Sequence, residues 1–215
     1  MVAEDAGGVS LFRFRPAAVG IDRHLREAVM PELLRRPGVV DVFAGRQGPD
    51  ELGPRIVASV WDRADAGAGG GPVPVAVLRP PHLDDAVDGD LVAAPLRFGF
   101  RFRATDAATV MRVVEGAARP GSLDAYVAEA RAGTLRDAEV GHAPLALYLA
   151  TMPPDAFLTV SVWADWATVE AATGGSAGRP VATRHTELLA AWSATHYELL
   201  PAGAGSAGAI ASAAT

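Results

Sequence analysis

The sequence contains the segment LFRFR at Leu11–Arg15 and a close copy of it, GFRFR, at Gly99–Arg103. A second segment, SVW, occurs at Ser59–Trp61 and again at Ser161–Trp163, each time at the end of a run of alternating residues. Alternation with a period of two is typical of a half-buried β-strand. Because both pairs recur in the same order with helix-like sequence between them, we expect a duplicated α+β unit.

Around the first copies, the pattern predicts a strand, a helix and two further strands. Apolar residues at helical spacing begin at Ile21, and Pro37-Gly38 is expected to end that helix. Residues 39–44 and 55–61 then alternate as strands. The first unit is therefore expected to run β-α-β-β before a stretch rich in glycine and proline.

The second copies lie in a longer series of predicted elements. Ser122 is a candidate N-cap for a helix that begins at Leu123. The other elements expected after residue 80, in chain order, are a short acidic helix over 82–90, a helix over 106–118, strands at 145–151 and 157–163, helices at 165–172 and 183–191, and a strand at 195–200.

Three regions follow from this pattern. We expect a first unit at 9–95, whose second half is degenerate, and a second unit at 96–201. The boundary falls where a closing strand of the first unit runs into the opening strand of the second. Residues 202–215 contain almost only Gly, Ala, Ser and Thr and are expected to form a disordered tail.

Composition narrows the classes of function. The chain has 215 residues, half of them hydrophobic, and a net charge of −6 without any basic run, so neither nucleic acid nor an anionic membrane is an expected partner. The absence of Cys excludes disulfides, thiolate nucleophiles and Cys-based metal sites. No apolar run has the length of a membrane span and no signal peptide is visible, so a cytoplasmic location is expected.

Several short motifs together resemble one known group of proteins. They are the helix ending at Pro37-Gly38, the two SVW segments, and the stretch Ser161–Trp166 followed later by His196–Glu198. With these features the chain resembles the antibiotic-biosynthesis-monooxygenase-like group of the dimeric α/β-barrel superfamily. The resemblance implies two ferredoxin-like βαββαβ units in an α+β fold, which a tandem chain would bring together as an intramolecular α/β barrel.

The strand patterns suggest which faces such a barrel would enclose. Ile56, Ala58 and Val60 form an apolar face that we expect under helices, as do Leu158, Val160 and Val162 in the second unit. The opposite faces, with Ser, Thr and Trp, and the Arg face of the LFRFR and GFRFR strands would then line an enclosed cavity. The alternative is an open sheet whose arginines face water.

Site residues follow from that cavity and from the resemblance. We expect catalytic roles for His185 and Trp163, and no metal site. The residues expected to bind substrate are Arg13, Arg101, Arg103, Trp61, Ser161, Tyr148 and His196. For the tryptophans, tyrosine and histidines, ordinary packing is the competing explanation.

The leading functional hypothesis is a small-molecule-binding barrel protein that acts as a cofactor-independent monooxygenase on an aromatic, polyketide-like substrate. The substrate anion would bind Arg101 or Arg103 and stack on Trp163, while His185 moves a proton. The chain would act as a monomeric pseudo-dimer or as a homodimer. The alternative is a ligand-binding or assembly protein without catalysis.

A third hypothesis is haem binding through His185 or His196. Members of the resembling group that degrade haem use an Asn in the active site, and this chain contains no Asn. The distance in sequence from Trp163 to His185 is also longer than is usual in that group. Both differences argue against haem degradation.

Overall fold

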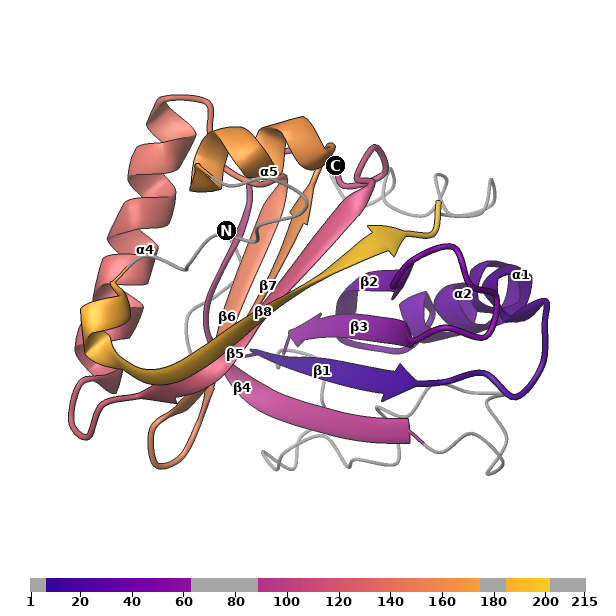
Figure 1. Ribbon diagram of the computed structural model, residues 1–215, viewed down its shortest axis with the longest axis horizontal. Helices are drawn as coiled ribbons and strands as arrows, with labels where there is room; N and C mark the ends of the chain where they lie inside the picture. Colours follow the sequence, from indigo (N-terminus) through magenta and orange to yellow (C-terminus); the bar gives the residue numbers. More distant parts are fainter. Residues whose placement is uncertain (1–6, 63–88, 175–184, 202–215) are drawn as a thin grey trace.

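The computed structural model describes residues 7–62, 89–174 and 185–201, and its elements are shown in Figure 1. The N-terminal half contains β1 (Gly7–Phe14), α1 (Ile21–His24), a π-helical segment η1 (Leu25–Val29), α2 (Met30–Leu34), β2 (Val39–Arg46), β3 (Arg55–Asp62) and β4 (Gly89–Arg101). The C-terminal half contains β5 (Val110–Ala118), α4 (Leu123–Glu139), β6 (Ala146–Met152), β7 (Ala156–Trp163), α5 (Trp166–Thr173), a 3-10 turn η3 (Thr186–Leu188) and β8 (Leu189–Leu199).

The eight strands form a closed antiparallel barrel in the order β1-β3-β2-β8-β5-β7-β6-β4. Within the N-terminal half the order is β4-β1-β3-β2, and within the C-terminal half it is β8-β5-β7-β6. In each half the fourth and first strands are neighbours and the second strand is at the far edge. The predicted α+β class is confirmed.

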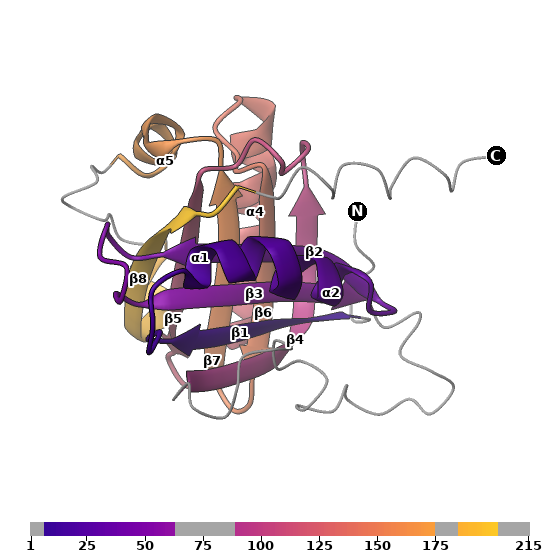
Figure 2. The same cartoon turned by 90° about the vertical axis from the view of Figure 1, so that its right-hand side faces the viewer.

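The helices lie outside the barrel on opposite sides. Figure 1 shows α4 and α5 beside the strands of the C-terminal half, and Figure 2 shows α1 and α2 in front of the strands of the N-terminal half. Each half therefore has one sheet face toward the barrel interior and one face toward its own helices.

The barrel interior is a packed apolar core, and this corrects our expectation about the strand faces. The faces that we expected under helices line the interior, where Ile56, Ala58, Val60, Leu158, Val160 and Val162 belong to one buried cluster. The Ser/Thr/Trp faces of β3 and β7 point outward, toward the helices. The reason is that a closed barrel shields its interior from water completely, so the more apolar face of each strand gains most by lying there.

Polar groups close this core near both ends of β2. Asp41 accepts hydrogen bonds from Tyr148 of β6 and from Arg101 of β4. Burial raises the pKa of Asp41, although both donors act in the opposite direction. Further along, Arg13 of β1 forms an ion pair with Glu115 of β5 at 2.6 Å. Both clusters connect the N-terminal half with the C-terminal half.

The helix side of the N-terminal half is filled by apolar side chains. Phe12 and Phe14 lie under the helices, as the sequence predicts, and pack with Leu25, Val29 and Leu33. The π-helical segment stands directly before Pro31, which has no N–H to donate to the preceding turn. Gly38, with φ of 79°, follows the helix in a conformation that favours glycine.

One predicted helix is largely a strand in the structure, and the last residues of another belong to a strand. Residues 110–118 form β5, which pairs with β7 on one side and with β8 on the other. The valines at 110, 113 and 114 fit helical spacing as well, but β-branched residues favour a strand once neighbours exist on both sides. Residues 189–191, expected at the end of a helix, begin β8 after the short turn η3.

The other predicted elements are largely confirmed. The strands at 39–44, 55–61, 145–151 and 157–163 correspond to β2, β3, β6 and β7. The helix after Ser122 is α4, but the Ser122 side chain makes no capping hydrogen bond. Asp165 caps α5, accepting a hydrogen bond from the backbone N–H of Thr168 at 2.8 Å.

The two copies of SVW lie in equivalent strands of the two halves, whereas the copies LFRFR and GFRFR do not. Ser59–Trp61 and Ser161–Trp163 lie at the ends of β3 and β7, which are the third strands of their halves. The LFRFR segment lies in β1, whereas Gly99–Arg103 overlaps the end of β4. The proposed boundary at 95/96 falls inside β4, whose first part pairs with β1 and whose second part pairs with β6.

The division into units 9–95 and 96–201 stays a prediction. The tail at 202–215 and most of the acidic helix at 82–90 lie outside the described residues.

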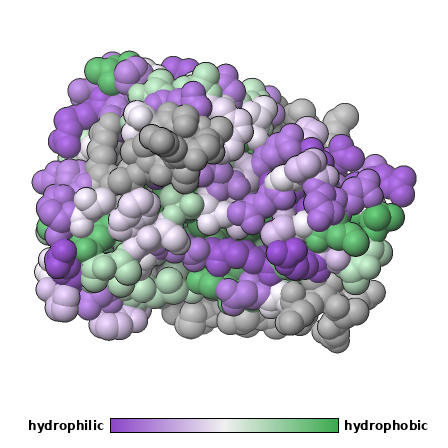
Figure 3. Space-filling model, viewed as in Figure 1, coloured by the Kyte–Doolittle hydropathy of each residue, from purple (hydrophilic) through white to green (hydrophobic). Residues whose placement is uncertain are grey.

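Among the helices that the structure describes, none combines the length and apolar character needed to cross a membrane. On the face shown in Figure 3, polar and apolar side chains are interspersed.

Candidate functional site

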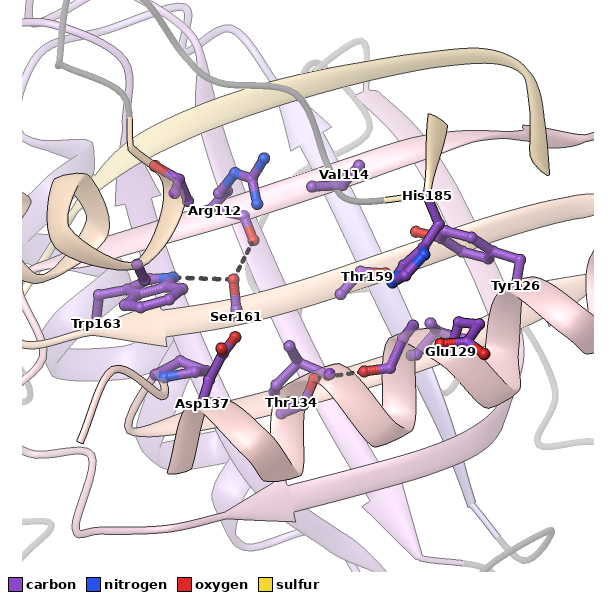
Figure 4. Close-up of a pocket in the computed structure, with 17 residues that line it drawn as sticks. Arg112, Val114, Tyr126, Glu129, Thr134, Asp137, Thr159, Ser161, Trp163 and His185 are labelled. Atoms are coloured by element: carbon purple, nitrogen blue, oxygen red, sulfur yellow. Dashed lines mark hydrogen bonds between the residues drawn. The ribbon is translucent and has the colours of Figure 1, made fainter. Parts of the chain in front are cut away.

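A cavity of about 130 Å³ lies on the outer face of the C-terminal half, between the strands and the helix α4. Its floor comes from β5, β6 and β7, its opposite wall from α4, and its margins from α5 and from the residue before η3 (Figure 4). The residues that line it are Arg112, Val114, Tyr126, Glu129, Ala130, Gly133, Thr134, Asp137, Pro144, Leu147, Leu149, Thr159, Ser161, Trp163, Ala172, Thr173 and His185.

The floor consists of two cross-strand pairs. Arg112 of β5 lies opposite Ser161 of β7, and Val114 lies opposite Thr159. Arg112 is only 8% exposed, and burial lowers its pKa from the ordinary value. A guanidinium nevertheless stays protonated at neutral pH, so the floor carries a buried positive charge. Such a group favours an anionic partner.

Trp163 forms one end of the floor, and its indole is fixed in place. The indole Nε1 donates a hydrogen bond to Ser161 Oγ at 3.0 Å, and Ser161 Oγ contacts the backbone oxygen of Arg112 at 3.4 Å. Trp163 also packs against Val110 and against Val169 of α5. This gives the cavity a rigid aromatic wall beside the buried cation.

The α4 wall combines small, polar and acidic residues. Ala130 and Gly133 leave room between the helix and the sheet, and Glu129 and Asp137 add two carboxyl groups to the lining. The hydroxyl of Thr134 is not available to a ligand, because it donates to the backbone oxygen of Ala130 at 2.8 Å.

His185 reaches the cavity from the opposite margin. In Figure 4 its imidazole extends toward the strand that carries Thr159. The Nε2 atom of His185 and the Oγ1 atom of Thr159 are both buried and have no hydrogen-bond partner within residues 7–62, 89–174 and 185–201. The backbone of His185 has φ of 62°, a left-handed conformation that is uncommon outside glycine and often occurs at functional sites.

His196 lies beside this cavity, not in its lining. It pairs with Arg112 across β5 and β8, and its ring packs against Trp166 in a tilted arrangement with the ring centres 5.0 Å apart. Burial, together with the positive charge of Arg112, lowers the pKa of His196 to about 4. The imidazole is therefore neutral at physiological pH.

The structure brings together three of the predicted site residues: Trp163, Ser161 and His185. It places the others elsewhere. Tyr148, which is buried, and Arg101, which is exposed at the end of β4, belong to the polar cluster around Asp41. Burial and then the charge of Asp41 raise the pKa of Tyr148.

Arg103 is exposed beyond the end of β4, and Trp61 lies on the outer face of the N-terminal half against Gly8. Arg13 lines a second, more open hollow, together with Arg15, Arg55 and Tyr197. Arg13 is held there by Glu115, and Arg55 by Asp22 at 2.5 Å and by backbone oxygens. The second hollow is also more open to solvent, so it is the weaker candidate.

Arg112 and Thr159 are the important residues that sequence reasoning missed. Arg112 was assigned to a predicted helix, where a single Arg among valines carries no signal. In a strand, Arg112 shares one face with Val110 and Val114, and only the pairing of β5 with β7 places it opposite Ser161. Thr159 shares the polar face of β7 with Ser161 and Trp163 but was not selected.

The cavity does not fit haem. A space of about 130 Å³ holds roughly one aromatic ring, whereas a porphyrin contains four pyrrole rings. The imidazole of His196 faces Trp166 instead of this space. In the part of the chain that the structure describes, no group of three or more His, Asp or Glu side chains is arranged to hold a metal ion.

No protein-family model matches the chain, and no curated protein matches it in sequence. Three solved structures share its fold over most of their length. A proposed monooxygenase from Fusobacterium nucleatum subsp. nucleatum has a TM-score of 0.62 at 10% identity, covering 92% of this chain and 94% of that one. A proposed monooxygenase from Lactobacillus acidophilus has a TM-score of 0.60 at 12% identity, covering 92% and 97%.

The third structure is an anthrone oxidase-like protein, with a TM-score of 0.53 at 13% identity, covering 93% of each chain. The fold is the one these proteins share. At such low identity the likeness concerns the fold alone, and it agrees with the fold of the group that the sequence resembles.

Proposed function

We propose that the chain binds a small aromatic anion in the cavity beside α4 and oxidises it with dioxygen, without a resident cofactor. The observation that carries this proposal is the partly open cavity itself, whose lining combines the buried cation of Arg112, the fixed indole of Trp163 and the buried Nε2 of His185. The sequence resemblance to antibiotic-biosynthesis monooxygenases and the fold likeness to proposed monooxygenases support the same reaction class.

The size of the cavity favours a single-ring substrate. A volume of about 130 Å³ is comparable to cavities that accept benzene. A three-ring substrate such as an anthrone would require the α4 wall to move away from the sheet. We therefore expect a monocyclic phenol or a related anion, with its ring against Trp163.

The reaction can be written in balance for a phenol. One oxygen atom of O₂ becomes a new carbonyl oxygen on a ring carbon, and the other leaves as water with the hydrogens of that ring carbon and of the hydroxyl. Both electron pairs come from the substrate, which is thereby oxidised to a quinone. The redox chemistry then requires no other reductant.

The side chains would bind the substrate, orient it and accept its proton. Arg112 stabilises the negative charge of the substrate, and its burial strengthens that interaction because little water screens it. His185 accepts the hydroxyl proton through Nε2, which makes the ring more electron-rich. In this proposal Arg112 binds the substrate anion, in place of Arg101 or Arg103, which the sequence had suggested for that role.

We also infer that the chain is a fused pair of ferredoxin-like units that supplies both halves of the barrel, and that it acts as a monomer. The matching strand orders of the two halves support this. The two polar clusters that connect the halves inside the barrel support it as well.

Oxygen consumption tests the proposed reaction. We expect the chain to consume O₂ with hydroxyquinol but not with anthrone, and to lose this activity in Trp163→Ala and Arg112→Gln. Arg103→Gln is the matched control, because Arg103 is exposed outside the cavity, and it should retain activity. Ligand binding without oxygen uptake across a panel of phenols would favour a binding protein without catalysis.

A further inference from the structure

Two polar atoms in the cavity have no hydrogen-bond partner among the residues that the structure describes. They are Thr159 Oγ1 and His185 Nε2, both shielded from solvent. A buried hydroxyl or imidazole nitrogen without a partner destabilises the folded state, and such groups in native proteins call for an explanation. Since both atoms belong to residues that line one cavity, a ligand that satisfies both is the simplest explanation.

The two atoms define a second polar end of the cavity. Thr159 stands two residues before Ser161 on the same face of β7, so the Thr159 pair and the Arg112 pair are about 7 Å apart along the strands. A single aromatic ring with polar substituents at opposite positions spans such a distance. One substituent would reach Arg112 and the other would reach Thr159.

The surroundings of His185 determine what its Nε2 can accept. The Nδ1 atom lies 3.6 Å from a carboxylate oxygen of Glu187. A nearby carboxylate favours the tautomer with the proton on Nδ1, which leaves a lone pair on Nε2. The turn is held by the backbone N–H of Leu188, which donates to the His185 oxygen at 3.0 Å. Nε2 is therefore a hydrogen-bond acceptor in the cavity.

We propose that Thr159 and His185 together recognise a hydroxyl group on the ligand. The hydroxyl donates its proton to His185 Nε2, and its oxygen accepts a hydrogen bond from Thr159 Oγ1. A ketone or a halogen at the same position has no proton to donate, so the pair selects hydroxylated rings. Glu187 is a positioning residue that acts through His185. This inference depends on the proposed function only for the ligand class, a small aromatic anion.

Calorimetric titration of the full chain with three benzoates tests the selection. The probes are 4-hydroxybenzoate, 4-fluorobenzoate, which is similar in size but has no proton to donate, and benzoate. We expect 4-hydroxybenzoate to bind about tenfold more tightly than the other two, the factor given by one hydrogen bond. Thr159→Val should weaken this preference, because it removes one of the two hydrogen bonds to the ligand hydroxyl and leaves the one accepted by His185 Nε2.

Thr134→Val is the matched control. Thr134 lines the same cavity, but its hydroxyl is already bonded to Ala130 within α4. This variant should keep the preference for 4-hydroxybenzoate. Glu187→Ala should reduce the preference, and Glu187→Gln should retain most of it, because an amide oxygen near Nδ1 also favours the proton on that nitrogen.

Thermal unfolding without ligand provides an independent measurement. Thr159→Val removes a buried hydroxyl that has no partner, so the unfolding temperature should rise by about 2–4 °C. Thr134→Val removes a satisfied hydroxyl and should not raise it. A lower unfolding temperature for Thr159→Val would show that its hydroxyl is already bonded in the free protein, which overturns the inference.

The titrations also separate this inference from the proposed function. Equal affinity of 4-hydroxybenzoate and 4-fluorobenzoate, or a preference that is unchanged in Thr159→Val, overturns the hydroxyl recognition and leaves the aromatic-anion site intact. Failure of all three benzoates to bind overturns the proposed site and this inference with it.

Discussion

The two halves of the barrel carry the same tripeptide at equivalent strand ends, yet the space between sheet and helices is filled by apolar side chains in the N-terminal half and forms the candidate cavity beside α4 in the C-terminal half. In the N-terminal half, Ser59 of β3 lies opposite Ser10 of β1, and their hydroxyls bond to each other at 2.6 Å. In the C-terminal half, Ser161 of β7 lies opposite Arg112 of β5. The same serine is thus satisfied by a small neighbour in one half and stands beside a buried cation in the other.

The next cross-strand pair shows the same difference. Phe12 lies opposite Val57 in the N-terminal half, and both are packed under α1 and α2. The equivalent pair in the C-terminal half is Val114 and Thr159, which both line the cavity. The repeated segment SVW is therefore part of an equivalent strand in each half. The residues opposite that strand on β1 or β5 decide whether the space beneath the helices is filled or open.

The largest expected effect on ligand affinity comes from placing Phe, which stands at the equivalent position of the N-terminal half, at residue 114. Val114→Phe places the residue of the N-terminal half in the C-terminal half, where the larger ring occupies the space of the ligand. We expect at least about a hundredfold loss of affinity for 4-hydroxybenzoate, with a stability change within the roughly 1–3 kcal/mol typical of overpacking. Calorimetric titration and chemical unfolding measure the two effects.

Val114→Ile is the control for that exchange, since it adds a single methylene group and should retain binding. Unchanged affinity in Val114→Phe would show that the ligand site lies outside this cavity.

The next largest expected effect on ligand affinity comes from removing the positive charge of Arg112, which lies opposite Ser161. Arg112→Gln eliminates a charge-assisted interaction with the ligand, which is worth about 1.5–3 kcal/mol, or roughly tenfold or more in affinity. The affinity for benzoate should fall, while the affinity for neutral phenol should change little. Comparable loss in the exposed control Arg103→Gln would contradict the assignment of the anion to Arg112.

A change inside the barrel should alter stability without altering the cavity. Tyr148→Phe removes the hydrogen bond to buried Asp41, so we expect the free energy of unfolding to fall by about 1–2 kcal/mol. The affinity for 4-hydroxybenzoate should stay the same, because Tyr148 faces the barrel interior. Weaker binding at unchanged stability would instead support the ligand-binding role that the sequence suggested for Tyr148.

The smallest expected effect concerns acid sensitivity beside the cavity. The pKa of His196 is about 4 in the folded chain, below the ordinary value near 6.5, so the unfolded chain binds a proton more readily. Stability should therefore fall as the pH decreases from about 6.5 toward 4. Because His196 is only half-buried, we expect this contribution to be no more than about 1 kcal/mol.

His196→Gln, which cannot titrate, should flatten this part of the stability curve, measured by urea unfolding between pH 4 and pH 7. The pKa of Asp41 is raised and acts in the opposite direction, so the difference between the two proteins is the relevant quantity. Parallel curves would show that His196 titrates normally in the folded chain.

The sequence predicted the elements better than it predicted the faces. The alternating runs at 55–61 and 157–163 identified β3 and β7, and the helical spacing after Ser122 identified α4. The same patterns did not reveal which strand face lies inside. Both faces of these strands are buried, so hydrophobicity alone could not distinguish the barrel interior from the layer beneath the helices.

The sequence also indicated only some of the residues that line the candidate cavity, because it does not reveal which residues are partners across the sheet. Trp163, Ser161 and His185 were identified from the SVW segment and the family resemblance, and they line one cavity. Arg112 and Thr159 were not chosen, because their importance depends on being opposite particular residues across the sheet. Tyr148 and Arg101 were assigned to the ligand because their partner, Asp41, lies far away in the sequence.

By itself, the sequence determined local properties of this protein: the α+β class, most strand and helix positions, and the absence of cysteine chemistry. These properties depend on periodicity and composition, which can be seen from residues that are close together in the sequence. Only the tertiary structure decided that residues 110–118 are a strand, that the barrel interior is apolar, and that the cavity lies beside α4. Each of those outcomes depends on pairing between segments distant in the chain, and cross-strand partners and closure of the barrel are not encoded in any single segment.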